Sequence, residues 1–394
     1  MGIGLMKYMG HKGKMLPVLG DILLHYADGA ERIADPFCGS AAVSWFLAGN
    51  TGKEIISGDI QSFAVARAKA VVERTEPFAP DQMIKSWFAK ATGLVEKVAG
   101  HFPNNLRSIE PNLTEPNQIK QVVTQSRNFC RDVLPVVFDY LGGPWPISKA
   151  YGGYYYSPAQ ALVFDALRQC LPSDTDRRKV ALAALVEAVS RAAAAPGHTA
   201  QPFQPTESSA KYIIEAWTRN PWFLVKNAVE DISNRAALVK GKGVVSDFRK
   251  TIARLNAGDL VFADPPYSGV HYSRFYHALE TVTRGIEFEP EGRGRYPSIE
   301  ERPSSAFSKK TTAKKAAKQL LDACSEKRAT LILTFPTTGA SNGLEANYYV
   351  EYGRMLFSDV HVEEVESDFS TLGGNKKHRE ARQACNESII CFVP

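Results

Sequence analysis

Short apolar runs alternate with helical patterns in the first part of the chain. A short strand is predicted at 31–34, before a tight turn, and a helical pattern then extends to Ala48. A short apolar run at 54–57 ends beside Asp59 and leads into a helical pattern over 64–72. Because strand, turn and helix repeat in this order, the pattern predicts the beginning of a doubly wound α/β sheet.

The later part of the chain supplies further strands of the same type. Apolar runs at 260–263 and 330–334 flank a helical pattern at 313–324, and another apolar run follows at 388–393. Between the two parts, residues 75–240 hold helical segments broken by polar and proline-rich loops. We therefore predict a Rossmann-like, doubly wound α/β fold into which a mostly helical module is inserted.

The composition is that of a globular protein with a modest positive charge. The 394 residues are 44% hydrophobic and 23% charged, with a formal net charge of +5. This charge is compatible with a polyanionic partner without establishing one. The longest apolar run, 181–195, is interrupted by Glu187 and Arg191, and the first residues lack the apolar stretch of a signal peptide. We expect a soluble, cytoplasmic protein.

The cysteine pattern also favours a reducing compartment. The six cysteines are scattered, with no Cys-x-x-Cys pair and no histidine cluster at metal-ligand spacing. Reduced thiols are therefore expected rather than a disulfide framework, and no metal site is predicted.

The turn Asp35-Pro-Phe-Cys-Gly-Ser40 is the first candidate for chemistry. It follows a predicted strand, and its glycine lets the backbone approach a ligand at the edge where α/β sheets bind nucleotides. Asp59 follows the next strand, where a carboxylate commonly accepts hydrogen bonds from ribose hydroxyls. Pro36 lacks the N–H that a pyrophosphate loop needs, so the turn suits S-adenosylmethionine, which has no phosphate, better than NAD. A helix-capping Asp35 with a solvated Asp59 is the alternative interpretation.

The second candidate is Asp264-Pro-Pro-Tyr267, directly after an apolar strand. Pro265 and Pro266 fix the backbone and leave carbonyl oxygens without neighbouring donors. Asp264 and a proline carbonyl then suit both hydrogens of a planar amino group, while Tyr267 offers an aromatic face to a base that has left its helix. Holding the amine in line with an electrophilic methyl group is catalysis by orientation and electrostatics. A rigid turn with a helix-capping aspartate is the alternative.

These two motifs resemble the cofactor and catalytic motifs of amino-methyltransferases, and a third segment narrows the match. The segment Lys7-Tyr-Met-Gly-His-Lys-Gly-Lys-Met-Leu-Pro17 is similar to the N-terminal segment of the Dam-like class of DNA N6-adenine methyltransferases. The stretch 382–394 is similar to the basic–Glu–apolar strand that closes members of that class. The motif order, with Asp-Pro-Pro-Tyr after a long insertion, also fits.

The resemblance implies an activity, a cofactor and the residues of a site. It implies site-specific transfer of a methyl group from S-adenosylmethionine to N6 of a flipped-out adenine in double-stranded DNA. The implied catalytic residues are Asp264, Pro265, Pro266 and Tyr267. The implied cofactor-binding residues are Tyr8, Lys12, Asp35, Pro36, Phe37, Gly39, Ser40, Asp59, Asp247 and Asp264.

The resemblance also divides the chain by role. Residues 1–74 are expected to form the cofactor-binding half of the catalytic domain, 75–240 an inserted target-recognition region, and 241–394 the catalytic half of the same domain. Double-stranded DNA is the implied partner, in the cytoplasm of a prokaryotic cell or a phage-infected host. The sequence leaves open a restriction or phage-defence partner, and whether the protein is a monomer or a dimer.

The sequence departs from the pattern of the class at two places. The class has Gly-Ser-Gly where this chain has Gly39-Ser40-Ala41, and we expect the extra methyl group to tighten the cofactor cleft. The Phe-Asn-Gly-rich loop of the class is replaced by residues 196–205, which leaves the DNA contacts undefined.

Several residues have a binding interpretation beside an ordinary structural one. Asp247 is either an acid near the adenine end of the cofactor or a loop acid. The candidates for contacts with DNA are Arg274, Tyr276, His198, Lys376 and Lys377. The structural alternative is an amphipathic helix start for Arg274 and Tyr276, and a helix-terminating loop for His198. For Lys376 and Lys377 it is a solvated surface loop. The aromatic patch 151–156 is interpreted as core packing in preference to base stacking.

Two other functions remain compatible with the sequence. One is the same chemistry on adenine in RNA or on cytosine N4 in DNA, although aspartate rather than serine at position 264 favours adenine. The other is a non-catalytic nucleic-acid-binding subunit of a modification or defence system. An intact Asp-Pro-Pro-Tyr motif argues against the second.

Overall fold

The computed structural model describes residues 6, 8, 12–102, 118–337, 340–368 and 384–394, and these form two compact units. The described parts of 8–77, 235–273 and 303–394 form the α/β unit. Those of 78–234 and 274–302, with Met6, form the helical unit. The helical unit thus takes in 274–302, which the sequence analysis assigns to the catalytic half.

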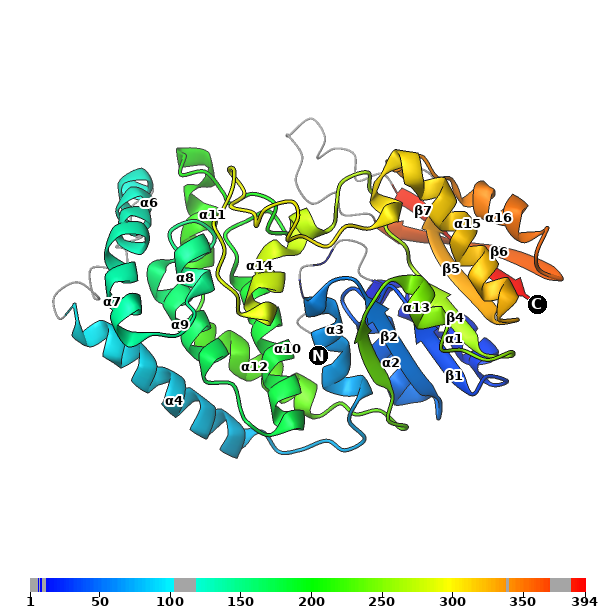
Figure 1. Ribbon diagram of the computed structural model, residues 1–394, viewed down its shortest axis with the longest axis horizontal. Helices are drawn as coiled ribbons and strands as arrows, with labels where there is room; N and C mark the ends of the chain where they lie inside the picture. The colour runs from blue at the N-terminus through cyan, green and yellow to red at the C-terminus, as the bar shows by residue number, and fades with distance from the viewer. Residues whose placement is uncertain (1–5, 7, 9–11, 103–117, 338–339, 369–383) are drawn as a thin grey trace. The chain divides into compact units, whose positions relative to one another are not determined.

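The α/β unit is built on a seven-stranded sheet with the strand order β3-β2-β1-β4-β5-β7-β6. Strands β3, β2, β1, β4 and β5 are parallel, whereas β7 is antiparallel to both of its neighbours. In sheet order the strands are β3 (Lys242–Val245), β2 (Glu54–Asp59), β1 (Arg32–Asp35), β4 (Leu260–Ala263), β5 (Thr330–Pro336), β7 (Ala384–Val393) and β6 (Asp359–Asp368). The predicted doubly wound α/β fold is confirmed (Figure 1).

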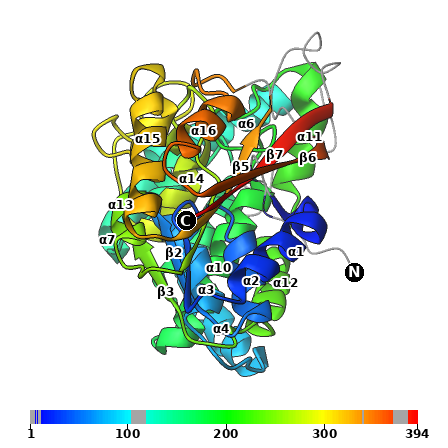
Figure 2. The ribbon, with the colours of Figure 1, turned by 90° about the vertical axis from the view of Figure 1, so that its right-hand side faces the viewer.

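Helices cover both faces of this sheet. Figure 2 shows α13, α15 and α16 on one side of the sheet and α1 and α2 on the other, with α3 packed against α2. The helices of this unit are η1 (Lys12–Lys14), α1 (Leu16–Ala27), α2 (Ala42–Asn50), α3 (Ser62–Val72), α13 (Phe248–Ile252), η4 (Ala306–Ser308), α15 (Lys310–Glu326) and α16 (Ala346–Gly353). Because both faces are covered, central strands such as β4 are buried at every position, which explains their unbroken apolar runs.

The strand order reverses between β1 and β4, and this reversal determines where a ligand fits. From β1 the chain continues to β2 on one side, and β4 later pairs with β1 on the other. The loops that follow these two strands therefore diverge and leave a crevice at the carboxyl edge of the sheet. Both sequence motifs, the Asp35 turn and the Asp264 turn, lie at this edge.

The helical unit has its own interior. Its helices are α4 (Asp81–Gly100), α6 (Ile119–Asn128), η3 (Phe129–Val133), α7 (Leu134–Leu141), α8 (Pro146–Tyr151), α9 (Pro158–Gln169), α10 (Thr175–Ala192), α11 (Glu207–Trp217), α12 (Pro221–Ser233) and α14 (Ser273–Arg284). None of the helices in the described residues is long and apolar enough to cross a membrane.

The aromatic patch that follows α8 belongs to this interior. Tyr151, Tyr155 and Tyr156 are fully buried, and each hydroxyl has a hydrogen-bond partner within the unit. Tyr151 pairs with Nδ1 of His277, whose pKa is lowered to about 3 by burial, so this histidine is neutral at physiological pH. The interpretation of the patch as core packing is confirmed for these three tyrosines.

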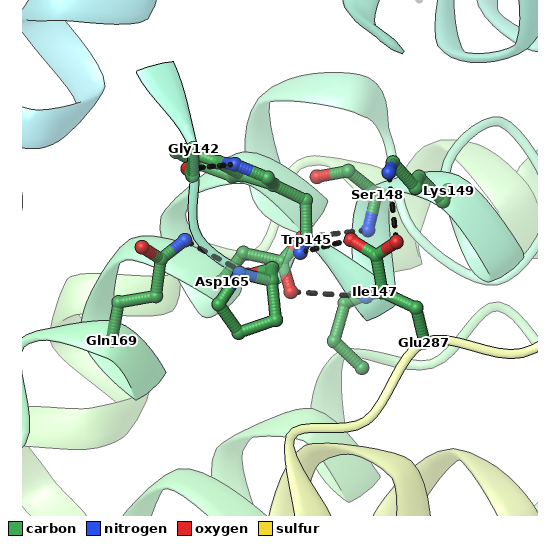
Figure 3. A network of polar contacts seen from close by, with 9 residues as sticks. Gly142, Trp145, Ile147, Ser148, Lys149, Asp165, Gln169 and Glu287 are labelled. Carbon is green, nitrogen blue, oxygen red and sulfur yellow. Dashed lines mark hydrogen bonds and ion pairs between the residues drawn. The ribbon is translucent and has the colours of Figure 1, made fainter. Parts of the chain in front are cut away.

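A buried acid holds the start of α8 in place. The Asp165 carboxylate, from α9, accepts hydrogen bonds from the backbone N–H groups of Ile147 at 2.9 Å and Ser148 at 2.7 Å (Figure 3). Beside it, Glu287 accepts from the backbone N–H of Trp145. The first N–H groups of a helix have no acceptor within the helix, and buried N–H groups cannot bind water instead. The carboxylates of these two acids supply the acceptors.

Replacing Asp165 by asparagine is expected to loosen α8. Asparagine offers one acceptor oxygen and one NH2 group, so one buried amide loses its acceptor, at a cost of about 1–3 kcal/mol. Backbone hydrogen exchange over 146–151 should become faster. Asp174→Asn is the matched control, because exposed Asp174 caps α10 through the single amide of Arg177, which asparagine caps equally well. Exchange unchanged by Asp165→Asn would contradict this role.

Asp165 should also make the stability of the helical unit depend on pH. Burial raises the pKa of Asp165 from 3.8 to about 7. The folded-state pKa of Asp165 therefore lies above its value in the unfolded chain. As a result, the contribution of Asp165 to the free energy of unfolding is fully present below about pH 4 and is lost as the pH rises through about 7. The Asp165→Asn variant should lack this component.

Candidate active site

One cavity opens at the switch point of the α/β unit. Its volume is about 1000 Å³, a figure that includes the solvent at its mouth. All of its lining residues belong to the α/β unit. Every predicted catalytic and cofactor-binding residue lines it, namely Tyr8, Lys12, Asp35, Pro36, Phe37, Gly39, Ser40, Asp59, Asp247, Asp264, Pro265, Pro266 and Tyr267. The structure therefore brings these predicted residues together, from segments up to 259 positions apart in the case of Tyr8 and Tyr267.

The turn after β1 is shaped by a glycine and an aspartate. Gly39 has φ of +47°, and a Cβ at this position would lie 2.7 Å from the Tyr8 hydroxyl, so only glycine fits without displacement. The Asp59 carboxylate, at the end of β2, accepts hydrogen bonds from the backbone N–H of Gly39 at 3.1 Å and of Gln61 at 2.9 Å. Asp59 thus ties together the two loops that form one wall of the cavity.

Asp35 is the most deeply buried acid of the cavity. Its Oδ2 accepts a hydrogen bond of 2.6 Å from the Ser44 hydroxyl, to which Ser57 donates in turn. Its Oδ1 is buried and has no hydrogen-bond partner among the described residues. Burial raises the pKa of Asp35 to about 7, and the nearby carboxylates Asp59 and Asp264 add to this effect while Ser44 opposes it. A buried acceptor without a donor indicates a site for a donor-bearing ligand.

Ala41 occupies a backbone conformation that favours glycine. It precedes α2 with φ of +66° and is completely buried. The left-handed conformation costs an alanine about 1–2 kcal/mol relative to glycine, which explains why the class pattern has glycine here. The extra methyl group lies in the interior, and Ala41 is not among the lining residues of the cavity, so the expectation that it tightens the cleft finds no support.

The Ala41→Gly variant is expected to be nearly neutral in stability. Relief of the left-handed backbone is offset by the lost methyl burial, about 0.8 kcal/mol, and by the greater entropy of an unfolded glycine, about 0.4–1 kcal/mol. Ala48→Gly, also fully buried but inside α2, has only the unfavourable terms and should cost about 1–2 kcal/mol. Thermal unfolding of both variants checks this, and equal destabilisation would contradict it.

Three aromatic rings form an apolar wall of the unit beside the cavity. Phe37 stacks on Phe248 at 5.6 Å between ring centroids, and Phe307 meets both rings edge-on. Asp247, the residue before Phe248, caps α13. Its carboxylate accepts hydrogen bonds from the backbone N–H and the side chain of Arg249. The structural interpretation of Asp247 therefore holds, and its position on the cavity leaves the cofactor interpretation open.

The turn after β4 is held rigid by a neighbouring loop. The Asn342 side chain donates a hydrogen bond of 3.0 Å to the Pro266 carbonyl, and the backbone N–H groups of Ser341 and Asn342 donate to the Tyr267 carbonyl. Among the described residues none donates to the Pro265 carbonyl, which therefore keeps its acceptor capacity. Of the two prolines, Pro265 therefore suits the role of acceptor for an amine better than Pro266.

The Asp264 carboxylate is paired with a buried lysine. Its Oδ1 lies 3.1 Å from Nζ of Lys12 and accepts a 3.0 Å hydrogen bond from Thr334, whereas Oδ2 has no partner among the described residues. Lys12 also forms an ion pair with Glu387. Burial alone would lower the pKa of Lys12, but the carboxylates of Asp264 and Glu387 outweigh it and raise that pKa, so the ammonium stays charged.

The predicted DNA-contacting residues lie outside this cavity. Arg274 is exposed on the helical unit, where its guanidinium donates to the Tyr296 hydroxyl. Tyr276 is buried in the interior of that unit, so its ring contacts DNA only if α14 moves. His198 is partly buried, and its ring packs against Phe275. Lys376 and Lys377 lie outside the described residues.

Sequence reasoning missed several residues of the site. They are Ser44, Thr334, Asn342 and the segment 303–306, which lines the cavity. Glu387 was recognised only as the glutamate of the closing basic–Glu–apolar strand, and its contact with Lys12 was not foreseen. The others are ordinary polar residues in polar or strand-like surroundings and gave no signal.

The comparisons with known proteins agree with this site. A family model described as "D12 class N6 adenine-specific DNA methyltransferase" matches residues 8–110 and 151–331. The chain belongs to this family. The match includes both motif turns, and the family implies a methyl-donor cofactor and DNA as substrate.

A curated relative supports the same placement. "Modification methylase LlaI" from Lactococcus lactis subsp. lactis is 22% identical over 308 residues, which cover 78% of this chain. The matched region is 43% of the length of that relative, so the chain spans less than half of it.

Proposed function

We propose that this protein transfers a methyl group from S-adenosylmethionine to the N6 amino group of an adenine in double-stranded DNA, at a specific sequence. The observation that carries the proposal is the meeting of the Asp35 turn, Asp59 and the Asp264 turn around one cavity. The family match supports the reaction, and the site supports the assignment of residues.

The charge of the cavity suits S-adenosylmethionine. Among its described lining residues are four aspartates, Asp35, Asp59, Asp247 and Asp264, and one cationic side chain, Lys12. The cofactor carries a sulfonium and an ammonium group against one carboxylate, whereas the demethylated product has lost the sulfonium charge. An acidic cavity therefore binds the substrate form in preference to the product form, and it disfavours phosphate-bearing nucleotides.

Individual residues match parts of this cofactor. Asp59 is positioned at the end of β2 to accept hydrogen bonds from ribose hydroxyls, and Asp247 with the Phe37 and Phe248 rings suits an adenine. The unpartnered Oδ1 of Asp35 suits the ammonium group. Gly39 leaves room for the close approach of the ligand to the backbone.

The Asp264 turn binds and orients the target amine. Oδ2 of Asp264 and the Pro265 carbonyl accept the two hydrogens of N6, and Tyr267 stacks on the base. When bound, the cofactor supplies an electrophilic methyl group. The Asp264 carboxylate stabilises the positive charge that develops on N6 as the new bond forms, which is a larger effect in a buried site than in water.

The helical unit is proposed to select the target sequence. Arg274 and His198 from this unit, and Lys376 and Lys377, are candidate contacts with phosphates or bases. The modification methylase name of the relative supports a place in a restriction–modification system. A DNA substrate is consistent with activity in the cytoplasm.

The test is methyl transfer from labelled S-adenosylmethionine to unmethylated duplex DNA, followed by nucleoside analysis and methylation-aware sequencing. N6-methyladenine at one repeated sequence is the expected result. Incorporation at cytosine N4 or into RNA alone would contradict the proposed substrate. Absence of incorporation by a protein that still binds the cofactor would contradict the proposed activity.

A further inference from the structure

Glu387 is buried at the edge of the sheet that carries the candidate active site. It is 2% exposed and precedes the apolar part of β7, in which Ile389 and Ile390 are completely buried. Isolating a carboxylate in such surroundings costs several kcal/mol unless it is paired. Its partner is Lys12, which lines the cavity, so Glu387 is linked to the site through one side chain.

The sheet register places this acid beside the Asp264 turn. Ala263 pairs with Leu333 across β4 and β5, so Asp264 follows at the level of Thr334. Thr334 in turn pairs with Ile389 of β7, which runs antiparallel. Glu387 is two residues from Ile389 and hence on the same face of the sheet as Thr334. Three neighbouring strands therefore deliver an acid, a hydroxyl and a second acid to one edge.

One ammonium group serves two carboxylates in this arrangement. Nζ of Lys12 contacts Oδ1 of Asp264 and Oε1 of Glu387, and the three groups together carry a net negative charge. A pair made of Lys12 and Asp264 alone would be neutral, and its carboxylate would be a weaker acceptor for an amine that becomes positive. The second acid restores the negative potential at Asp264.

We propose that Glu387 is a positioning residue for methyl transfer, which holds the Lys12 ammonium between two carboxylates so that Asp264 keeps its negative charge available to the target amine. This inference rests on the proposed function, because it assigns a role within the same reaction.

The acidity of Asp264 gives the inference a measurable consequence. Burial raises the pKa of Asp264 to about 6; Lys12 lowers it, Glu387 raises it, and the hydrogen bond from Thr334 lowers it. Asp35 is the other acid that faces Asp264, from β1. Because the reaction uses the carboxylate, wild-type kcat/KM should fall as the pH drops through about 6 rather than through about 4.

The experiment compares three variants, two of them isosteric with the wild-type residue, by the pH profile of kcat/KM for methyl transfer to duplex DNA. Glu387→Gln still accepts a hydrogen bond from Lys12 but has no charge, so its acid limb should move to lower pH, with a loss of roughly tenfold in rate above pH 7. Thr334→Val removes a hydrogen bond to the carboxylate, so its acid limb should move to higher pH. Glu387→Asp keeps the charge and should keep the wild-type limb.

Opposite shifts of the acid limb in Glu387→Gln and Thr334→Val distinguish a positioning role of Glu387 from a merely structural role. A structural role predicts a lower melting temperature for Glu387→Gln with an acid limb at the wild-type position, and that result would overturn the inference while leaving the proposed function intact. Shifts of both variants in one direction would overturn it as well. A wild-type protein that transfers no methyl group would contradict the proposed function itself.

Discussion

Replacing Asp264 by alanine is expected to reduce methyl transfer to adenine by about a thousandfold. The variant removes the acceptor for one amine hydrogen and the negative charge that faces the developing positive charge on N6. The fold should survive, because Lys12 retains Glu387 as its partner and no buried ammonium is left unpaired. Single-turnover transfer from labelled S-adenosylmethionine measures the loss.

Two controls define the outcome for Asp264→Ala. Its melting temperature should stay close to that of the wild type, and its affinity for S-adenosylmethionine, measured by calorimetry, should fall by far less than the rate, because three other aspartates of the cavity remain. Retention of more than about a tenth of the wild-type rate would contradict the catalytic role of Asp264. A loss of cofactor binding as large as the loss of rate would assign Asp264 to the cofactor instead.

The second large effect is expected at Asp59. Alanine at this position leaves the backbone N–H groups of Gly39 and Gln61 without their acceptor and removes the proposed contact with the ribose. A charge-assisted hydrogen bond is worth about 1.5–3 kcal/mol, so loss of the ribose contact alone should lower the affinity for S-adenosylmethionine by about tenfold to a hundredfold, and the disturbed turn should add to this loss.

The comparison with Asp247 gives this prediction its control. Asp247 lines the same cavity, but its oxygen already binds Arg249 and its side chain is 36% exposed. Asp247→Ala should therefore weaken cofactor binding by less than about tenfold. Equal losses in the two variants, measured by calorimetry, would contradict the special role of Asp59, and the milder Asp59→Asn variant distinguishes lost binding from a disturbed turn.

Sequence analysis predicted best the strands that are buried on both faces of the sheet. The run at 260–263 coincides with β4, because a central strand covered on both faces is apolar throughout. β3 and β6 were missed. β6 mixes polar and apolar residues over 359–368 in a pattern that includes five acidic residues, and β3 is partly exposed, so neither has an unbroken apolar run.

The domain organisation shows a similar division. The helical patterns within 75–240 correspond to helices of the structure, because amphipathic periodicity is a local property. Residues 274–302 pack with the helical unit although they follow the Asp264 turn directly in sequence. Packing of this kind depends on contacts such as that of His277 with Tyr151, 126 residues away, which no local pattern reports.

The sequence by itself determined the two motif turns, because a turn that binds a ligand through its own backbone needs particular residues at adjacent positions, such as Pro36, Gly39 and the prolines after Asp264. Only the tertiary structure decided which groups surround them. Thr334 is 70 residues from Asp264, and Glu387 is 375 residues from Lys12. Strand order and register bring these groups together, and the low polarity of the interior makes their charges act on one another.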